Sequence, residues 1–436
     1  MTGVALNDER RIRPAWRIIG LVAVAVLAFG GTVQTAVRGA EWKAGAAQVD
    51  ITPGELMWMA GYAARKKPAD GYAQNLYAKA LALEDEKGNR VVIVTMDLIG
   101  VLRSLRDAVE KKVAAELNLP GAAVLLNASH THCGPEYRER PGREEEARRY
   151  HTLLEQRVVS VIGQALERLA PAELSWGEAR AGFAANRRGE IGGRRGPILT
   201  GPVDHAVPVL CVASPEGQLR AILFGYACHN TTLSSVATID GEPRYEFNGD
   251  YAGYAQEYLQ QAHPEAVAMF LAGCGADQNP HPRRDMVPSI APLEMAQHHG
   301  RTLSLAVEAV LNAPRRPVRA PLSCALEEVE LVRTGDQAGP FAYPVQVLRF
   351  GDDLTLVALA SEVVVDYSLR LKRELSQKAP AAVWIAGYSN GYFGYVPSVR
   401  ILEEGGYEAG PWDASIEERI VGTVHRLVEA PRSEGP

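Results

Sequence analysis

A run of apolar residues from Val91 to Met96 limits the folds open to this chain more than any other feature. The run is apolar at almost every position until Asp97, whereas a strand with one face in water alternates apolar and polar residues. A strand that is apolar on both sides is buried on both faces, as in the centre of a layered α/β protein. We therefore expect an α/β fold in which mixed β-sheets pack against flanking helices.

Strand-like and helix-like segments alternate along the rest of the chain, and no linker divides it into independent domains. The predicted strands are 44–51, 76–83, 90–97, 122–126, 174–183, 207–213, 220–227, 266–271, 323–332, 344–350, 354–360 and 382–387. The predicted helices are 102–117, 144–169, 251–261, 292–313, 363–374 and 415–428. We expect a single large domain that extends from residue 41 to residue 436.

Composition excludes several classes of protein. With 47% hydrophobic and 22% charged residues the chain is an ordinary globular protein, not a disordered one or a multi-span membrane protein. The net charge of -6 gives no sign of the clustered basic face that a nucleic-acid partner requires. The five cysteines are widely spaced without a Cys-x-x-Cys pair, which favours neither a zinc ribbon nor a disulfide scaffold.

The first 40 residues differ from the rest of the chain. Arginines at positions 10, 11, 13 and 17 precede an apolar run from Ile18 to Phe29, which is short for a transmembrane helix. This pattern is typical of a signal peptide, and an uncleaved membrane anchor is the alternative. Either interpretation places the folded part outside the cytosol, as a periplasmic, secreted or membrane-anchored protein.

The sequence Asn-Ala-Ser-His-Thr-His-Cys-Gly-Pro, from Asn127 to Pro135, directly follows the predicted strand 122–126. Because side chains two apart in a strand share a face, His130 and His132 are expected to point the same way. Two imidazoles at a strand end can hold a metal ion or transfer protons. The alternative is a pair of surface histidines in a loop.

Other polar residues also stand where predicted strands end. His229 follows strand 220–227, and Asp97 ends strand 90–97, where a helix cap or a turn is the alternative role. Glu362 lies at a strand-to-helix junction, where it could instead favour the helix N-terminus. Two histidines, a glutamate and a fourth oxygen donor would suit zinc. The full set of candidates is Asp97, His130, His132, Arg187, His229, Asn279, Glu362, Tyr395 and Tyr407.

Several short motifs occur in an order that resembles the amino-terminal catalytic domain of the neutral/alkaline non-lysosomal ceramidases. They are Ala47–Pro53, Gly61–Ala63, Leu76–Ala80, Ser129–Pro135, Asn186–Arg188, Ala227–His229, Asn248–Tyr251, Ala360–Glu362 and Asn390–Val396. The resemblance extends from about Ala44 to Tyr407. It implies a single catalytic domain, and the family's carboxyl-terminal immunoglobulin-like domain is expected to be absent.

The resemblance also implies a set of site residues. Zinc ligands would be His130, His229, Glu362 and Tyr395. Around the substrate carbonyl would stand His132 as general acid/base, with Arg187 and Tyr407 stabilising the oxyanion. Arg188 could take the place of Arg187. Zinc would lower the pKa of a bound water to about 7, which makes water a nucleophile.

One position departs from the family pattern. The family has Gly-Asp-x-Ser-Pro with a serine needed for activity, whereas this chain has Asn279 at that place. An asparagine cannot act as an activated nucleophile, but the amide of Asn279 could still orient the substrate in the catalytic site. We expect an exported, ceramidase-like zinc amidohydrolase that cleaves a small-molecule or lipid N-acyl substrate, a role compatible with a membrane surface. The alternatives are a hydrolase of another ester, N-acyl or glycan substrate, or a non-catalytic homologue that binds a lipid or glycan.

Overall fold

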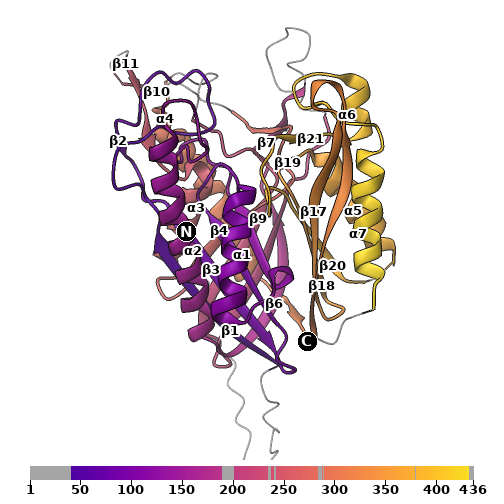
Figure 1. Ribbon diagram of the computed structural model, residues 1–436. Coiled ribbons are helices and arrows are strands. Elements are labelled where there is room, and N and C mark those ends of the chain that lie inside the picture. The colour runs from indigo at the N-terminus through magenta and orange to yellow at the C-terminus, as the bar shows by residue number, and fades with distance from the viewer. Residues whose placement is uncertain are drawn as a thin grey trace, which may run out of the picture. The chain divides into compact units, whose positions relative to one another are not determined.

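The computed structural model (Figure 1) describes residues 41–188, 201–233, 237–239, 242–282, 287, 289–378 and 380–431. The chain divides into two compact units, Met1–Gly39 and Ala40–Pro436, and everything below concerns the second. The predicted export segment, residues 1–40, lies outside the described residues. Within those residues, every helix is either too short or too polar to cross a lipid bilayer.

A nine-stranded mixed sheet forms one layer of the fold. Its order is β13 (Val267–Ala272), β9 (Leu219–Tyr226), β8 (Ala206–Ala213), β6 (Ala170–Arg180), β1 (Trp42–Asp50), β3 (Tyr77–Asp85), β4 (Arg90–Met96) and β5 (Val124–Ala128), with β15 (Arg316–Val318) paired to β6. The outer pairs β13–β9 and β4–β5 are parallel, and the pairs between them are antiparallel. Parallel pairs bring the carboxyl ends of both strands to the same edge.

A second sheet has the order β16 (Leu322–Arg333), β17 (Gly339–Phe350), β18 (Leu354–Leu359) and β20 (Ala382–Ala386). The flanking helices are α1 (Arg103–Leu117), α2 (Glu144–Glu167), α3 (Asp250–Ala262) and α4 (Pro292–Leu311) on the first sheet, and α5 (Val365–Lys378) and α7 (Ile416–Glu429) on the second. The layers therefore run helices, sheet, sheet, helices (Figure 1). The predicted fold class, mixed sheets with flanking helices, is confirmed.

The strand that constrained the fold is buried on both faces, as predicted. Val92 and Val94 of β4 pack into the core beneath α1 and α2, while Val91 and Ile93 belong to the core between the two sheets. All four side chains are fully buried. Burial of each contributes roughly 1.5–3 kcal/mol of hydrophobic stabilisation, so this strand anchors both cores.

The remaining elements are short, and several of them carry the site described below. They are β2 (Gly71–Tyr72), β7 (Ala184–Asn186), β10 (Ala237–Ile239), β11 (Glu242–Arg244), β12 (Glu246–Phe247), β14 (Gln278–Pro280), β19 (Glu362–Val363), β21 (Tyr395–Val396), α6 (Val399–Glu404) and two 3₁₀ turns at Gly121–Ala123 and Gly335–Gln337. The sequence did not predict these strands, because two or three residues are too few to show a period.

Candidate metal centre

The His-x-His motif brings its two rings together through a turn and not through the pleat of a strand. Strand β5 ends at Ala128, and His130 has a left-handed backbone with φ of +59°. The Nε2 atoms of His130 and His132 lie 3.2 Å apart. Gly61 makes room for His132, since a Cβ at position 61 would lie 2.4 Å from the Cγ of that ring. The rings therefore do meet, as expected, but for a different reason.

Two further side chains complete the cluster. His229, just after β9, places its Nε2 atom 3.1 Å from the Nε2 of His130. Glu362, the first residue of β19, places Oε2 3.3 Å from each of these two nitrogens. All three residues are buried, with exposed fractions of 4% or less. Residues separated by more than 200 positions in sequence thus converge on one point.

The hydrogen bonds behind the rings fix what the cluster can hold. Nδ1 of His130 lies 2.6 Å from the carbonyl oxygen of Ile99, and Nδ1 of His229 lies 2.8 Å from that of Gly275. A carbonyl only accepts, so each Nδ1 carries a proton and the neutral ring presents a lone pair at Nε2. Two lone pairs and a carboxylate then face one another, so positive charge, from a proton or a metal ion, is required between them.

A metal ion meets this requirement. Oε2 of Glu362 is buried and accepts no hydrogen bond of normal geometry from the described residues. Tetrahedral zinc with bonds of about 2.0–2.1 Å separates its ligand atoms by about 3.3 Å. The separations of 3.1–3.3 Å among His130, His229 and Glu362 match that spacing. The cluster of His130, His132 and His229, with Glu362 beside it, could therefore bind a metal ion.

The protonation states also suit a metal ligand set. Burial and the neighbouring imidazoles hold the pKa of His132 well below its usual value. Burial, together with the charge of Arg187, lowers the pKa of His229 to about 4. Burial opposes ionisation of Glu362; positive charge on His130 and His229 would hold the pKa of its carboxyl well below the ordinary range, and with both rings neutral a bound metal ion would supply that charge instead. Neutral imidazoles and an ionised carboxylate are the forms that bind metals.

Arg187 and Tyr395 lie next to this cluster. Tyr395 is directly paired with Glu362 in the parallel strands β19 and β21. Nη2 of Arg187 donates to the Tyr395 hydroxyl at 3.1 Å, and the exposed ring of Tyr407 lies 5.1 Å from the Tyr395 ring. Arg187 and not Arg188 thus reaches the site, because Arg188 turns to the carbonyl of Gly405.

A buried carboxylate, Glu408, separates the two arginines and was not found from the sequence. It accepts from Nε of Arg187 and from Nη1 of Arg188, both at 2.7 Å, and its exposed fraction is 2%. These ion pairs fix the direction in which Arg187 points. No local pattern around position 408 indicates the role, since its partners lie about 220 residues away.

A cavity of about 500 Å³ opens beside the cluster. Its lining comprises Trp58, Met59, Gly61, Tyr62, Ala63, Arg65, His132, Glu136, Arg138, Arg140, Pro141, Arg143, Glu362, Tyr392, Tyr395 and Tyr407. Tyr392 donates a hydrogen bond from its hydroxyl to Oε1 of Glu362 at 3.2 Å. The sequence analysis did not single it out, although it lies in the Asn390–Val396 motif.

Asn279 does not line this cavity. It lies on β14, and the backbone carbonyl of its neighbour Gln278 accepts a hydrogen bond from the His229 amide at 2.9 Å.

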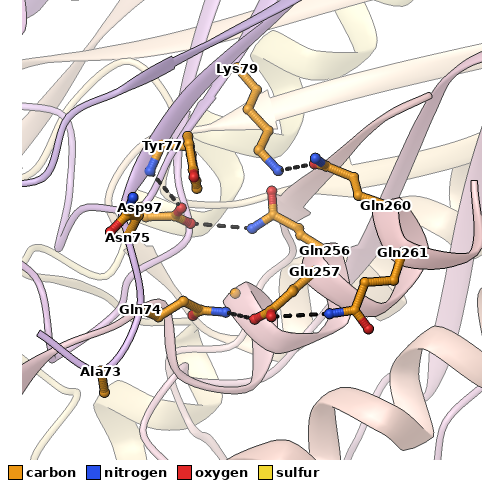
Figure 2. Close-up of a pocket in the computed structure, with 11 residues that line it drawn as sticks. Ala73, Gln74, Asn75, Tyr77, Lys79, Asp97, Gln256, Glu257, Gln260 and Gln261 are labelled. Atoms are coloured by element: carbon orange, nitrogen blue, oxygen red, sulfur yellow. Dashed lines mark hydrogen bonds between the residues drawn. The ribbon is translucent and has the colours of Figure 1, made fainter. Parts of the chain in front are cut away.

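Asp97 belongs to a different cavity, also of about 500 Å³, shown in Figure 2. Its carboxylate accepts from the backbone amide of Tyr77 at 3.0 Å and from Gln256 at 3.3 Å. Across that cavity, Lys79 donates to Gln260 at 2.6 Å and to the carbonyl of Ala268. Helix α1 starts at Arg103, so Asp97 neither caps it nor joins the histidine cluster.

Lys79 should make stability depend on pH. Burial lowers its pKa from 10.5 to about 8 although Asp97 opposes the shift, so between these values the unfolded chain binds more protons. Stability therefore rises with pH through this group. From pH 7.5 to 9.5 wild type should gain about 2 kcal/mol in unfolding free energy relative to Lys79→Met, measured by urea denaturation. Equal pH slopes for the two proteins would contradict the assignment.

The cluster should bind one divalent ion per chain. His229→Ala removes one of the converging nitrogens and should lower metal content to below about a tenth of wild type after dialysis, because removing a ligand from a buried site leaves the others without a cation. Metal content would be measured by mass spectrometry of the purified protein. His298→Ala, an exposed histidine on α4, is the matched control. Stoichiometric metal in both variants would exclude the cluster as the binding site.

A sequence model of the family described as "Neutral/alkaline non-lysosomal ceramidase, N-terminal" matches residues 42–273, more than half of the 436-residue chain. The neutral ceramidases of Drosophila pseudoobscura pseudoobscura and Drosophila melanogaster are each 35% identical to it, over 116 and 100 residues. These stretches cover 26% and 22% of this chain but only 16% and 14% of the two relatives.

Solved structures share the fold. The neutral ceramidase from Pseudomonas aeruginosa aligns with a TM-score of 0.73 and 19% identity, covering 89% of this chain and 75% of that one. A structure described as a ceramidase complexed with C2 aligns with a TM-score of 0.73 and 18% identity, covering 90% and 76%. The family model and the fold agree, and the chain belongs to the neutral/alkaline non-lysosomal ceramidase family.

Proposed function

We propose that residues 41–436 form a zinc-dependent hydrolase that cleaves the amide bond of an N-acyl substrate outside the cytosol. The observation that carries the proposal is the convergence of buried imidazole nitrogens and a buried carboxylate beside a cavity. Membership of a family whose named relatives are neutral ceramidases supports an amide as the bond cleaved. The basic and apolar pattern of residues 1–40 supports export.

The proposed ligands are His130, His229 and Glu362, with Tyr395 as the fourth. A bound zinc ion supplies Lewis acidity, which polarises a carbonyl and lowers the pKa of water. The Nδ1 bonds of His130 and His229 to backbone carbonyls hold both rings in the tautomer that zinc requires. The parallel pairing of Glu362 with Tyr395 brings the fourth ligand to the same end of the short sheet.

His132 is the proposed general acid/base. Its lowered pKa keeps the ring neutral at pH 7, so it can accept a proton from water and return it to the leaving nitrogen. The ring lines the cavity and packs at 4.6 Å against Tyr62, which limits its motion. Nδ1 is buried without a hydrogen-bond partner among the described residues, so Nε2, 3.2 Å from the Nε2 of His130, is the nitrogen proposed to transfer protons.

Arg187 and Tyr407 are the proposed donors to a developing oxyanion. Burial opposes the charge of Arg187, but Tyr395 and Glu408 raise its pKa, so the guanidinium stays protonated. Arg187 donates a hydrogen bond to the Tyr395 hydroxyl, which holds the guanidinium beside the proposed fourth ligand. Each such donor contributes about 3 kcal/mol to an oxyanion transition state. In this proposal water is the nucleophile, and Asn279, on β14 outside the cavity lining, does not react.

The test is hydrolysis of N-lauroyl amides by the zinc-loaded protein. His132→Ala should retain stoichiometric zinc while kcat falls by about 10²–10⁴, because it removes proton transfer and leaves the proposed ligands in place. Zinc content and kcat would be measured on the same preparation. Loss of zinc from His132→Ala would instead make His132 a ligand, and absence of hydrolysis across a broad amide and ester panel would reject the hydrolase.

Asn279→Ala is the comparison variant for the same assay. Since Asn279 does not line the cavity, its amide should affect kcat by no more than about tenfold, far less than the loss of His132. Mass spectrometry during turnover should find no acyl group on the protein. A covalent acyl-enzyme would show that a side chain, and not water, attacks the substrate.

A further inference from the structure

The loop between the His-x-His motif and helix α2 carries an excess of positive charge. Arg138, Arg140 and Arg143, called here the rim arginines, all line the cavity of the metal centre. Among the described residues that line the cavity, Glu136 is the only acidic one apart from Glu362. The chain as a whole has a net charge of -6, so this positive excess runs against the balance of the protein.

Arg138 is fixed close to the metal centre. It forms a bidentate ion pair with Glu136, with contacts of 2.7 and 2.6 Å, and lies 5.4 Å from the centroid of the Tyr392 ring. The hydroxyl of that same tyrosine contacts Glu362. One tyrosine ring therefore separates the guanidinium of Arg138 from the carboxylate of the metal cluster.

Arg143 and Arg140 keep most of their donors available. The guanidinium carbon of Arg143 lies 3.3 Å from the centre of the Trp58 ring; it forms no close ion pair among the described residues, and Glu146 acts on it only through its charge. Stacking on an aromatic ring holds a guanidinium in place while its N–H groups still point outward. Arg140 is about half exposed, and its ion pair within the described part of the chain is with Glu136 at 3.6 Å. Glu139 does not compensate, since its partner is Arg148 at 3.7 Å.

We propose that the substrate of the amide hydrolase described above carries an anionic group in its polar part, a carboxylate or a phosphate, which the rim arginines bind. A preorganised, partly desolvated fork of N–H donors matches the planar geometry of such an anion. A neutral N-acyl lipid would leave Arg143 without a close anionic partner and the donors of Arg140 largely unused, while Arg138 would keep its pair with Glu136. The rim arginines then determine specificity, while the metal cluster and His132 act on the bond itself.

Binding of non-hydrolysable sulfonamides tests recognition apart from turnover. N-dodecylsulfonylglycine carries a carboxylate, and N-dodecylsulfonylglycinamide is its neutral match. Calorimetry with the zinc-loaded protein should show that the carboxylate compound binds at least tenfold more tightly than the neutral amide. Arg143→Gln and Arg140→Gln should each remove most of that preference. Arg157→Gln, an exposed arginine of α2 outside the cavity, should leave the preference unchanged. Salt should weaken anion binding, because these charges are partly exposed.

Hydrolysis assays identify which anion is used. A carboxylate is tested by comparing N-lauroylglycine with N-lauroylglycinamide. A phosphate is tested by comparing N-lauroyl-O-phosphoethanolamine with N-lauroylethanolamine. The substrate with the preferred anion should have at least tenfold higher kcat/KM than its neutral match. Equal binding of the two sulfonamides, or a preference that both glutamine variants retain, overturns this inference even if every amide is hydrolysed. Preferential anion binding without hydrolysis of any amide rejects the hydrolase and leaves anion recognition standing.

Discussion

The structure depends on one electrostatic constraint, the mutual approach of imidazole lone pairs and a carboxylate in a buried place. Moving an ionised carboxylate out of water costs several kcal/mol, and facing lone pairs repel one another. No donor among the described residues forms a hydrogen bond of normal geometry with Oε2 of Glu362, so this cost is not offset there. A cation at the centre of His130, His229 and Glu362 would remove both penalties at once, which is why this cluster could bind a metal ion.

The backbone around the cluster is held in conformations that ordinary residues avoid. His130, Ser361, Tyr388 and Asn390 all have φ between +49° and +63°. Such positions cost about 1–3 kcal/mol each and persist only where neighbouring structure enforces them. Asn127 provides part of that enforcement, since its amide donates to the Gly387 carbonyl and accepts from the Ala272 amide. This buried side chain thereby ties together the ends of strands from both sheets.

Much of the architecture follows from the sequence because long strands and helices have visible periods. The apolar strand at Val91–Met96 predicted the layered core, and strand ends pointed to His130, His229 and Glu362. The reason offered for His130 and His132 was nevertheless incorrect, since the strand stops at Ala128 and a left-handed turn brings the rings together. Turn geometry of that kind depends on contacts with distant residues such as Gly61, which no local pattern contains.

Other parts of the site could not be predicted, because their function depends on distant partners. Glu408 is recognisable only once Arg187 and Arg188 are seen on either side of it, and Asp97 stands at a strand end yet faces Lys79 in a separate cavity. The family resemblance supplied roles for Tyr395 and Tyr407 that spacing alone could not give. It supplied none for the rim arginines, whose significance comes from the cavity they line.

X-ray absorption spectroscopy of the protein loaded with one equivalent of zinc tests the central claim most directly. The account predicts at least two imidazole ligands at about 2.0 Å, seen by their multiple scattering, with the remaining ligands being nitrogen or oxygen and none being sulfur. A shell made of oxygen atoms only, or one containing a thiolate at about 2.3 Å, would contradict it.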